Sequence, residues 1–474
     1  MLEKRNFYIN GQWVAPTKPN DFNVIDPSTE ETCAVISLGD QADTDAAVAA
    51  AKSAFADWAF VDKSEKLALL KRLLEIYNDR AEEMAQAMSL EMGAPISMSR
   101  TNQVGAGSWH LTGFIEAFEK MSLERDFSAT EKTLLEPIGV CALITPWNWP
   151  MNQVVLKVAP AVAVGCTTVL KRSEIAPLSS HLFAQYMDEA GFPKGVFNMV
   201  HGDGPGVGSQ LSAHKDVDMV SFTGSSRAGK LISKSAADTL KRVSLELGGK
   251  GANIVFADSG AKGIEYGATR CFRNSGQSCN APTRLLVESS IYDEAVEIAT
   301  RIANETRVGP ASEEGQHIGP VVSETQYDKI QSLIEIGINE GRLTAGGLGR
   351  PDGLNRGFYV KPTVIADVTN DMTIAREEVF GPVLSVMKFD TIDDAIAITN
   401  DTDFGLTNYI HTPDDEKRQY TARRVRSGMV ETNGAGFAQG SPFGGYKQSG
   451  NGREGGLYGL EEFLEVKAVS GWSS

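Results

Sequence analysis

Short apolar segments alternate with helical segments along most of the chain after residue 133. The apolar segments include TTVLKR, MVSFTGS, ANIVFA and TRLLVES, and amphipathic stretches such as SSHLFAQYMDEAG and RAGKLISKSAADT lie between them. Strands and helices in this order are typical of a parallel sheet covered by helices on both faces. One such region precedes Gly249 and a second follows it. The sequence therefore predicts an α/β fold with two doubly wound parallel-sheet domains.

The two ends of the chain do not follow this alternation. The N-terminal quarter is predicted to be mainly helical, with one helix from Asp43 to Ala59, capped by Asp43 or Thr44, and another from Ser64 to Gly93. The last apolar segment, FLEVKAVSGW, is predicted to be a strand. It has no neighbouring strand in sequence, so we expect it to join a sheet elsewhere, in this chain or in another subunit.

Composition excludes several classes of function. Lys and Arg number 45 against 61 Asp and Glu, a net charge of −16, which argues against a nucleic-acid partner. The five Cys and six His show no metal-ligand spacing, so neither a metal site nor a disulfide framework is predicted. We find no signal peptide or membrane span in the sequence and expect no membrane partner and a cytoplasmic protein.

Cys279 is the candidate nucleophile, in the segment FRNSGQSCNAP. Small polar residues and a glycine before it predict a tight turn whose backbone N–H groups lower the pKa of the thiol and bind an oxyanion. A buried structural thiol is the alternative for any cysteine. The other four have apolar or β-rich neighbours, and we expect them to be structural: Cys33, Cys141, Cys166 and Cys271.

Two further segments contain groups suited to catalysis. Glu246 ends an apolar strand in VSLELGG, where it can serve as a general base with a raised pKa or simply be a solvated charge. Asn148 lies in TPWNWP, a rigid turn that can hold its amide as an oxyanion donor or that can be a purely structural corner.

A nucleotide site is suggested where two strands end. Gly224 and Gly229 in SFTGSSRAGKLI join a strand to a helix, a turn that can admit a pyrophosphate to the helix N-terminus. Lys171 and Glu174 lie in VLKRSE, which ends a predicted strand, and a carboxylate there can accept both hydroxyls of an adenosine ribose. Such a carboxylate would repel a 2′-phosphate, which favours NAD over NADP.

Together the segments PWNWP, LELGGK, FRNSGQSC, EEVFGPV and SPFGGYKQSG resemble the aldehyde dehydrogenase superfamily, in this order and spacing, over essentially the whole chain. The resemblance implies a cofactor domain over 1–118 and 141–247 and a catalytic domain over 248–446. It also implies a small oligomerisation element over 119–140 and 460–474, and hence a homodimer or homotetramer.

The resemblance also assigns roles to residues. It makes Cys279 the nucleophile, Glu246 the base for the hydrolytic water, and Asn148 with the Cys279 amide the oxyanion hole, while Lys157 and Glu454 match a proton-relay pair. NAD, with NADP as the alternative, is the implied cofactor. Its implied contacts are Trp147, Lys171, Glu174, Gly204, Phe222, Gly224, Ser225, Gly229, Leu247, Gln326, Lys329, Glu378 and Phe380.

The substrate is implied only as a small-molecule aldehyde. Positions that match the family's tunnel are Trp149, Asn152, Gln153, Leu156, Arg273, Ser278, Phe437 and Phe443. Arg273 matches an arginine that semialdehyde dehydrogenases use for a carboxylate, but their second arginine is Leu156 here. We therefore expect an aliphatic or ω-substituted aldehyde, with a carboxylated semialdehyde as the alternative.

Three other functions remain open on the sequence. A dehydrogenase that acylates coenzyme A normally lacks the base at Glu246, and a reductase that forms acyl phosphates needs a phosphate site that we do not find. A non-catalytic binding protein is disfavoured because Cys279, Glu246 and Asn148 are all intact.

Overall fold

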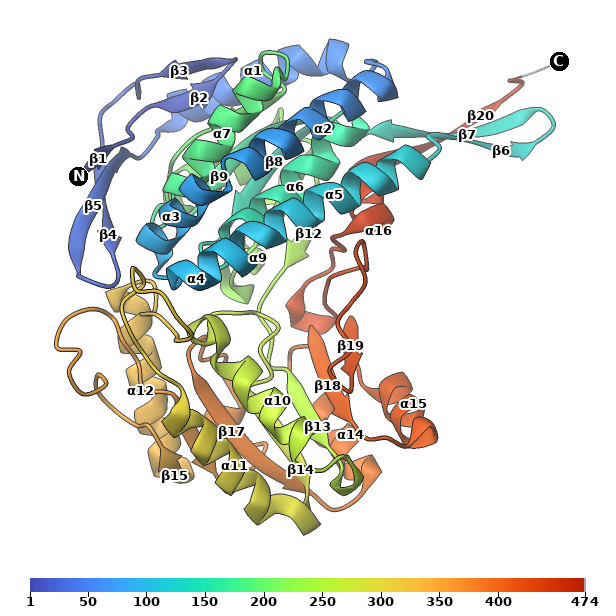
Figure 1. Ribbon diagram of the computed structural model, residues 1–474. Helices are drawn as coiled ribbons and strands as arrows, with labels where there is room; N and C mark the ends of the chain where they lie inside the picture. The colour runs from blue at the N-terminus through green and yellow to red at the C-terminus, as the bar shows by residue number, and fades with distance from the viewer. Residues whose placement is uncertain (473–474) are drawn as a thin grey trace.

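A computed structural model describes residues 1–472 and shows two α/β lobes with an extended hairpin at one end (Figure 1). The first lobe is built on a seven-stranded sheet of order β12-β11-β8-β9-β10-β2-β3. Its strands from β12 to β10 are mutually parallel, and β2 and β3 add an antiparallel edge. The bounds are β12 Arg242–Glu246, β11 Met219–Thr223, β8 Val140–Thr145, β9 Thr167–Arg172, β10 Phe197–Met199, β2 Phe7–Ile9 and β3 Gln12–Val14.

The second lobe contains another seven-stranded sheet, of order β15-β16-β17-β14-β13-β18-β19, in which only β15 is antiparallel to its neighbour. The prediction of two parallel-dominated α/β sheets is therefore confirmed. The bounds are β15 Arg342–Ala345, β16 Thr363–Ala366, β17 Val383–Phe389, β14 Arg284–Glu288, β13 Ala252–Val255, β18 Thr407–His411 and β19 Met429–Thr432.

Helices cover both sheets (Figure 1). Those of the first lobe are α1 Gln41–Trp58, α2 Lys63–Asp79, α3 Ala81–Met92, α4 Ile96–Met98, α5 Val104–Lys120, α6 Pro150–Val164, α7 Leu178–Ala190, α8 Ser209–Ala213 and α9 Ser226–Ala236. Those of the second half of the chain are α10 Ala261–Phe272, α11 Tyr292–Glu305, α12 Glu324–Glu340, α13 Thr373–Arg376, α14 Ile392–Asn400, α15 Asp415–Arg424 and α16 Gly456–Glu461.

The N-terminal region differs from the prediction in three ways. It contains β2 and β3 and a further small sheet of β1 Leu2–Glu3, β5 Glu31–Ser37 and β4 Asp21–Asp26, none of which was predicted, although helices make up most of residues 1–118 as expected. The cap of α1 is Asp40, and Asp43 completes its capping box from inside the helix. The predicted helix from Ser64 to Gly93 is two helices, because the backbone departs from helical geometry at Arg80.

The C-terminal strand finds its partner within the chain. β20 Leu464–Ser470 pairs antiparallel with β7 Glu131–Pro137, which pairs in turn with β6 Glu124–Ser128. This three-stranded sheet extends away from both lobes (Figure 1). Its two outer strands, β20 and β6, leave one edge each without a partner strand in the described chain.

Parallel pairing brings three of the predicted site segments together. β12, β11 and β8 are neighbours, so their carboxyl ends lie at one edge of the sheet, with Thr223 paired to Glu246. Gly224 follows the end of β11, and Asn148 lies three residues beyond Thr145, where β8 ends. This edge is where ligands bind in open α/β sheets. Within residues 1–472, no helix is long and apolar enough to cross a membrane.

Candidate active site

Two cavities share the half-buried Cys279 as a common lining residue. The smaller, of about 210 Å³, is lined on its other sides by Pro146, Trp147, Asn148, Thr223, Gly224, Ser225, Leu247, Gly248, Gln326, Lys329, Glu378 and Phe380. The larger has a volume of about 670 Å³. Its lining includes every residue predicted for the tunnel: Trp149, Asn152, Gln153, Leu156, Arg273, Ser278, Phe437 and Phe443. The thiol is thus accessible from two separate chambers.

The backbone before Cys279 is a strained turn. Asn274 and Ser275 adopt left-handed φ values of 55° and 56°, which are uncommon for residues with a side chain, and Gly276 follows at 72°. A Cβ on Gly276 would lie 2.6 Å from the nitrogen of Pro382, so only glycine fits there. The predicted tight turn is present, and it is packed directly against the segment that follows Phe380.

Asn148 is held in one orientation by three neighbours. Its Nδ2 donates to the carbonyl of Gln277 at 3.0 Å, and its own backbone oxygen accepts from Asn274 Nδ2 at 3.0 Å and from Gln103 Nε2 at 3.3 Å. The residue is buried, with 3% of its surface exposed. Because an amide nitrogen carries two hydrogens, one N–H of Asn148 is left without a described acceptor.

The thiol of Cys279 does not have the lowered pKa that the sequence predicts. Burial raises its pKa, and the carboxyl groups of Glu378, Glu246 and Glu454 raise it further. The backbone amide of Cys279 acts in the opposite direction but is the smaller effect. The prediction was wrong because the fold buries the thiol and brings close to it three acidic groups that are far apart in sequence.

Glu246 ends β12 with 2% of its surface exposed, and neither carboxyl oxygen has a hydrogen-bond partner in the described chain. Burial and the nearby Glu454 raise its pKa well above the ordinary value, while Lys157 opposes the shift. The raised pKa agrees with the prediction for a general base. Glycines make room for the carboxyl: a Cβ at Gly444 or Gly452 would lie 2.8 or 3.1 Å from Oε1.

Lys157 and Glu454 form a buried ion pair beside Glu246. Nζ of Lys157 lies 2.6 Å from Oε1 of Glu454 and donates also to Ser221 Oγ at 3.2 Å. The two side chains are 1% and 6% exposed, and Oε2 of Glu454 has no described partner. The backbones of Glu454 and the tunnel residue Phe443 are paired as an antiparallel bridge. The ion pair is therefore joined directly to the wall of the tunnel.

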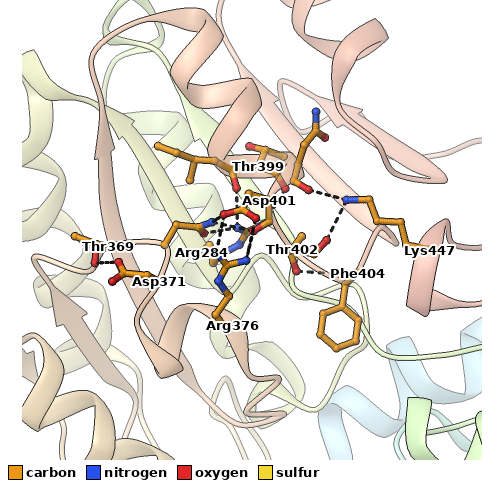
Figure 2. Close-up of polar contacts among 12 residues, drawn as sticks. Arg284, Thr369, Asp371, Arg376, Thr399, Asp401, Thr402, Phe404 and Lys447 are labelled. Carbon is orange, nitrogen blue, oxygen red and sulfur yellow. Dashed lines mark hydrogen bonds and ion pairs between the residues drawn. The ribbon is translucent and has the colours of Figure 1, made fainter.

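The segment between Phe443 and Glu454 is fastened to the second lobe. Lys447 Nζ donates to the backbone oxygens of Asn400 and Thr402 at 2.6 and 3.0 Å (Figure 2). Ser449 Oγ donates to the oxygen of Gly248 at 2.6 Å, and the next residue, Gly450, is bridge-paired with Glu246. The position of Glu246 therefore depends on contacts from both lobes.

Near the expected adenosine, Lys171 in β9 and Glu174 just after it form an ion pair of 3.2 Å. Burial lowers the pKa of Lys171. Ser225 caps α9 by accepting from the amide of Ala228 at 3.3 Å, which leaves earlier amides of the turn free to face a ligand. At Gly224 a Cβ would run into the ring of Phe222, so the turn approaches its own strand closely.

Five of the predicted cofactor residues lie outside the smaller cavity and line neither chamber: Lys171, Glu174, Gly204, Phe222 and Gly229. All five are in the first lobe. Gly204 begins a short helical turn over Gly204–Gly208, and Gly229 is buried in α9 against Leu247. The smaller cavity therefore covers only the part of the predicted cofactor site that is next to the thiol.

Glu378 and Phe380 form the opposite wall of the smaller cavity. Glu378 Oε1 accepts from the amide of Gly249 at 2.8 Å, and burial raises its pKa. Gln326 Nε2 donates to the backbone oxygen of Phe380 at 2.9 Å, and Lys329 Nζ donates to that of Glu378 at 2.8 Å. Gln326 and Lys329, predicted as ribose contacts, thus also hold this wall in place.

The sequence missed several residues of the larger cavity: Asn102, Ala106, Trp109, His110, Arg270, Asn280 and Ala281. Ala106, Trp109 and His110 share one face of α5 at helical spacing, which was the only available signal. Arg270 is bound to Glu431 at 3.3 Å, so its charge is compensated.

Comparison with known proteins agrees with this geometry. Residues 13–469 match the aldehyde dehydrogenase family. The chain belongs to that family. An aldehyde dehydrogenase crystal structure from Bartonella henselae superposes with a TM-score of 0.99 at 56% identity over 100% of both chains.

Two further aldehyde dehydrogenases are similar to the chain. The 3-succinoylsemialdehyde-pyridine dehydrogenase of a Pseudomonas species is 48% identical, over 100% of this chain and 99% of that one. Aldehyde dehydrogenase C of Pseudomonas syringae, a variant crystallised with NAD+ and octanal, has a TM-score of 0.98 at 46% identity and covers 99% of this chain and 97% of its own. The chain is thus an oxidoreductase of the aldehyde dehydrogenase family.

Proposed function

We propose that this aldehyde dehydrogenase oxidises an aldehyde to the carboxylic acid with NAD, through a covalent intermediate on Cys279. The observation that carries the proposal is that Cys279 lines both cavities, one suited to the cofactor and one to the aldehyde. The NAD+ complex of the Pseudomonas syringae relative supports the choice of cofactor.

The residues of the smaller cavity fit the nicotinamide half of NAD. Glu378, with an oxygen at the cavity wall, would bind the ribose next to the nicotinamide, and Phe380 with Trp147 would confine the ring. When bound, NAD supplies the carbon that accepts the hydride. Glu174 would accept the adenosine ribose hydroxyls, so turnover per KM should be higher with NAD than with NADP, and a strong preference for NADP would refute this role.

In the proposed reaction the sulfur of Cys279 attacks the aldehyde carbon and its proton leaves to water. The carbonyl oxygen becomes an oxyanion, held by the free N–H of Asn148 and the amide of Cys279. Loss of the aldehyde hydrogen with its electron pair then converts the thiohemiacetal into a thioester on Cys279.

Glu246 would take a proton from the water that attacks the thioester, releasing the acid and restoring the thiol. Its burial makes the ionised carboxylate a stronger base than an exposed one. The carboxylate of Glu454 would accept the proton next, while Lys157, which is already protonated, stays paired with it. An intact base disfavours transfer of the acyl group to coenzyme A.

We further propose the domain assignment that the family resemblance implies: cofactor domain 1–118 and 141–247, catalytic domain 248–446, and oligomerisation element 119–140 and 460–474. The exposed edge of β20, where Val466 is 70% exposed, supports a homodimer or homotetramer joined through this element. Size-exclusion chromatography with light scattering, with and without residues 464–474, tests it.

The proposed reaction is tested with Cys279→Ala and a matched control, Cys271→Ala. Cys271 is buried and lines neither of the two cavities, and its thiol donates to the backbone oxygen of Val383. We expect Cys279→Ala to abolish NADH formation and acyl-enzyme, and Cys271→Ala to retain both. Turnover by Cys279→Ala would refute the assignment.

For the substrate we propose an aliphatic or ω-substituted aldehyde. A semialdehyde is the second candidate, favoured by the 48% identity to a dehydrogenase named for one. A panel of short, long, aromatic, amino and carboxylated aldehydes, monitored by NADH absorbance, separates the two.

A further inference from the structure

Two polar side chains form a pair on the wall of the larger cavity. Nε2 of His110, from α5, lies 2.7 Å from Oδ1 of Asn152, from α6. Among the residues of α6, Asn152 alone is not buried, since it faces this cavity. The ring of Trp109 packs edge-on against His110 at 4.8 Å between ring centres.

The pair has a definite hydrogen-bond direction. An amide oxygen can only accept, so Nε2 of His110 donates. Burial lowers the pKa of His110 to about 4, which keeps the ring neutral near pH 7. The amide oxygen of Asn152 is thereby committed to His110, and its amino group, which has no described partner, remains as a donor toward the cavity.

The cavity contains further donors and no acid. Gln153 makes no side-chain hydrogen bond in the described chain, and its buried oxygen leaves the amino group as the accessible end. The guanidinium of Arg273 has no hydrogen bond or ion pair with any residue from 1 to 472. None of the residues that line the cavity is Asp or Glu. A cationic aldehyde would therefore be repelled by the unpaired charge of Arg273 and would find no carboxylate in the cavity lining to bind it.

We propose that the larger cavity selects aldehydes that carry an oxygen acceptor a few carbons from the aldehyde group. Asn152 donates to this oxygen, Arg273 supplies the positive charge at the wall, and His110 is a positioning residue that fixes the amide of Asn152. The oxygen belongs to a ketone or to a carboxylate, which share this acceptor chemistry. The inference rests on the proposed function and adds its substrate class.

Matched pairs of aldehydes test the acceptor. The first pair is 4-oxo-4-phenylbutanal and 4-phenylbutanal, which differ by one ketone oxygen. The second is 4-oxobutanoate and 4-methylpentanal, which have the same branched shape and differ in charge and acceptor. We expect kcat/KM to be about tenfold higher for the oxygenated member of at least one pair, the effect of one well-made hydrogen bond. The pair that responds identifies ketone or carboxylate.

Variants then identify the donor. In Asn152→Leu the kcat/KM ratio of the responding pair should fall from about ten to about one, and in Asn152→Asp, which replaces the donor by an acceptor, it should fall below one. His110→Phe should lower the ratio through a higher KM for the oxygenated probe, and His110→Gln, which can still donate, should restore it. Ser108→Ala, on α5 outside the cavity, should keep the ratio of ten.

The outcomes separate the inference from the proposed function. Oxidation of 4-phenylbutanal with a ratio of one for both pairs overturns the inference and leaves the dehydrogenase activity standing. Faster oxidation of 4-aminobutanal than of either oxygenated probe also overturns it. No NADH from any probe refutes both.

Discussion

Gly249 leaves room for the backbone of the nucleophile Cys279, and Gly249→Ala should lower the activity. A Cβ on Gly249 would lie 2.5 Å from the backbone oxygen of Cys279 and 3.2 Å from Cβ of Leu406. Since real Cβ atoms stay at least 3.0 Å from such neighbours, the Cys279 backbone must move by about 0.5 Å or more. A displacement of 1 Å in an active site costs on the order of 100-fold in rate, so we expect about a tenfold lower kcat/KM.

The control for Gly249→Ala is Gly341→Ala, far from the cavities. A Cβ on Gly341 would lie 2.8 Å from the backbone oxygen of Ala366, a comparable clash. Both variants should lose about 1–3 kcal/mol of unfolding free energy, measured by urea denaturation. Only Gly249→Ala should lose activity, measured as kcat/KM from NADH formation over a range of aldehyde concentrations at saturating NAD. Equal kcat/KM values for the two variants would refute the reasoning.

Three other perturbations have defined outcomes. Glu246→Gln should retain a single-turnover burst of NADH and lose about 100-fold or more in steady-state turnover, because only thioester hydrolysis needs the base; a wild-type steady-state rate would place the base elsewhere. Glu378→Gln should remove a negative charge that raises the pKa of Cys279, so that more thiolate forms and iodoacetamide alkylates it faster at pH 8; an unchanged alkylation rate would contradict this. Lys157→Met should leave Glu454 buried without its partner and cost about 3–5 kcal/mol of unfolding free energy at pH 8. That loss should shrink toward pH 5, because an unpaired buried carboxyl has a raised pKa and takes up a proton; urea denaturation giving equal losses at both pH values would argue against it.

The fold was predictable where neighbouring segments determine it. Alternating strands and helices predicted both parallel sheets, because a parallel connection needs a crossover helix that is visible in the sequence. β2 was missed because it and its hairpin partner β3 have only three residues each, and β10, which joins them to the sheet, lies almost 200 residues later. Such short strands are specified by tertiary pairing and have little local signal.

The candidate site residues were predictable where a reactive or polar side chain lies in a short segment with a recognisable local pattern. Cys279 and Asn148 lie in turns, and Glu246 ends a strand, so each has a local pattern. His110 has only its helical spacing with Ala106 and Trp109 as a local signal, because it reaches the cavity through the packing of α5 against α6. The direction of the Cys279 pKa shift was wrong for a related reason, since it depends on carboxyl groups from distant segments.

The same carboxyl groups explain how one site can hold a nucleophile and a base without interference. Burial raises the pKa of both Cys279 and Glu246, and the charge of Glu246 raises that of Cys279 further, so a thiolate and a carboxylate are costly to form at the same time. In the proposed reaction the sulfur becomes a neutral thioester, which cannot ionise and so cannot oppose the charge of Glu246. Lys157, already paired with Glu454, continues to favour the ionised form of Glu246. Glu246 can therefore ionise without an opposing thiolate once the acyl group is in place, which is when a water molecule has to be activated.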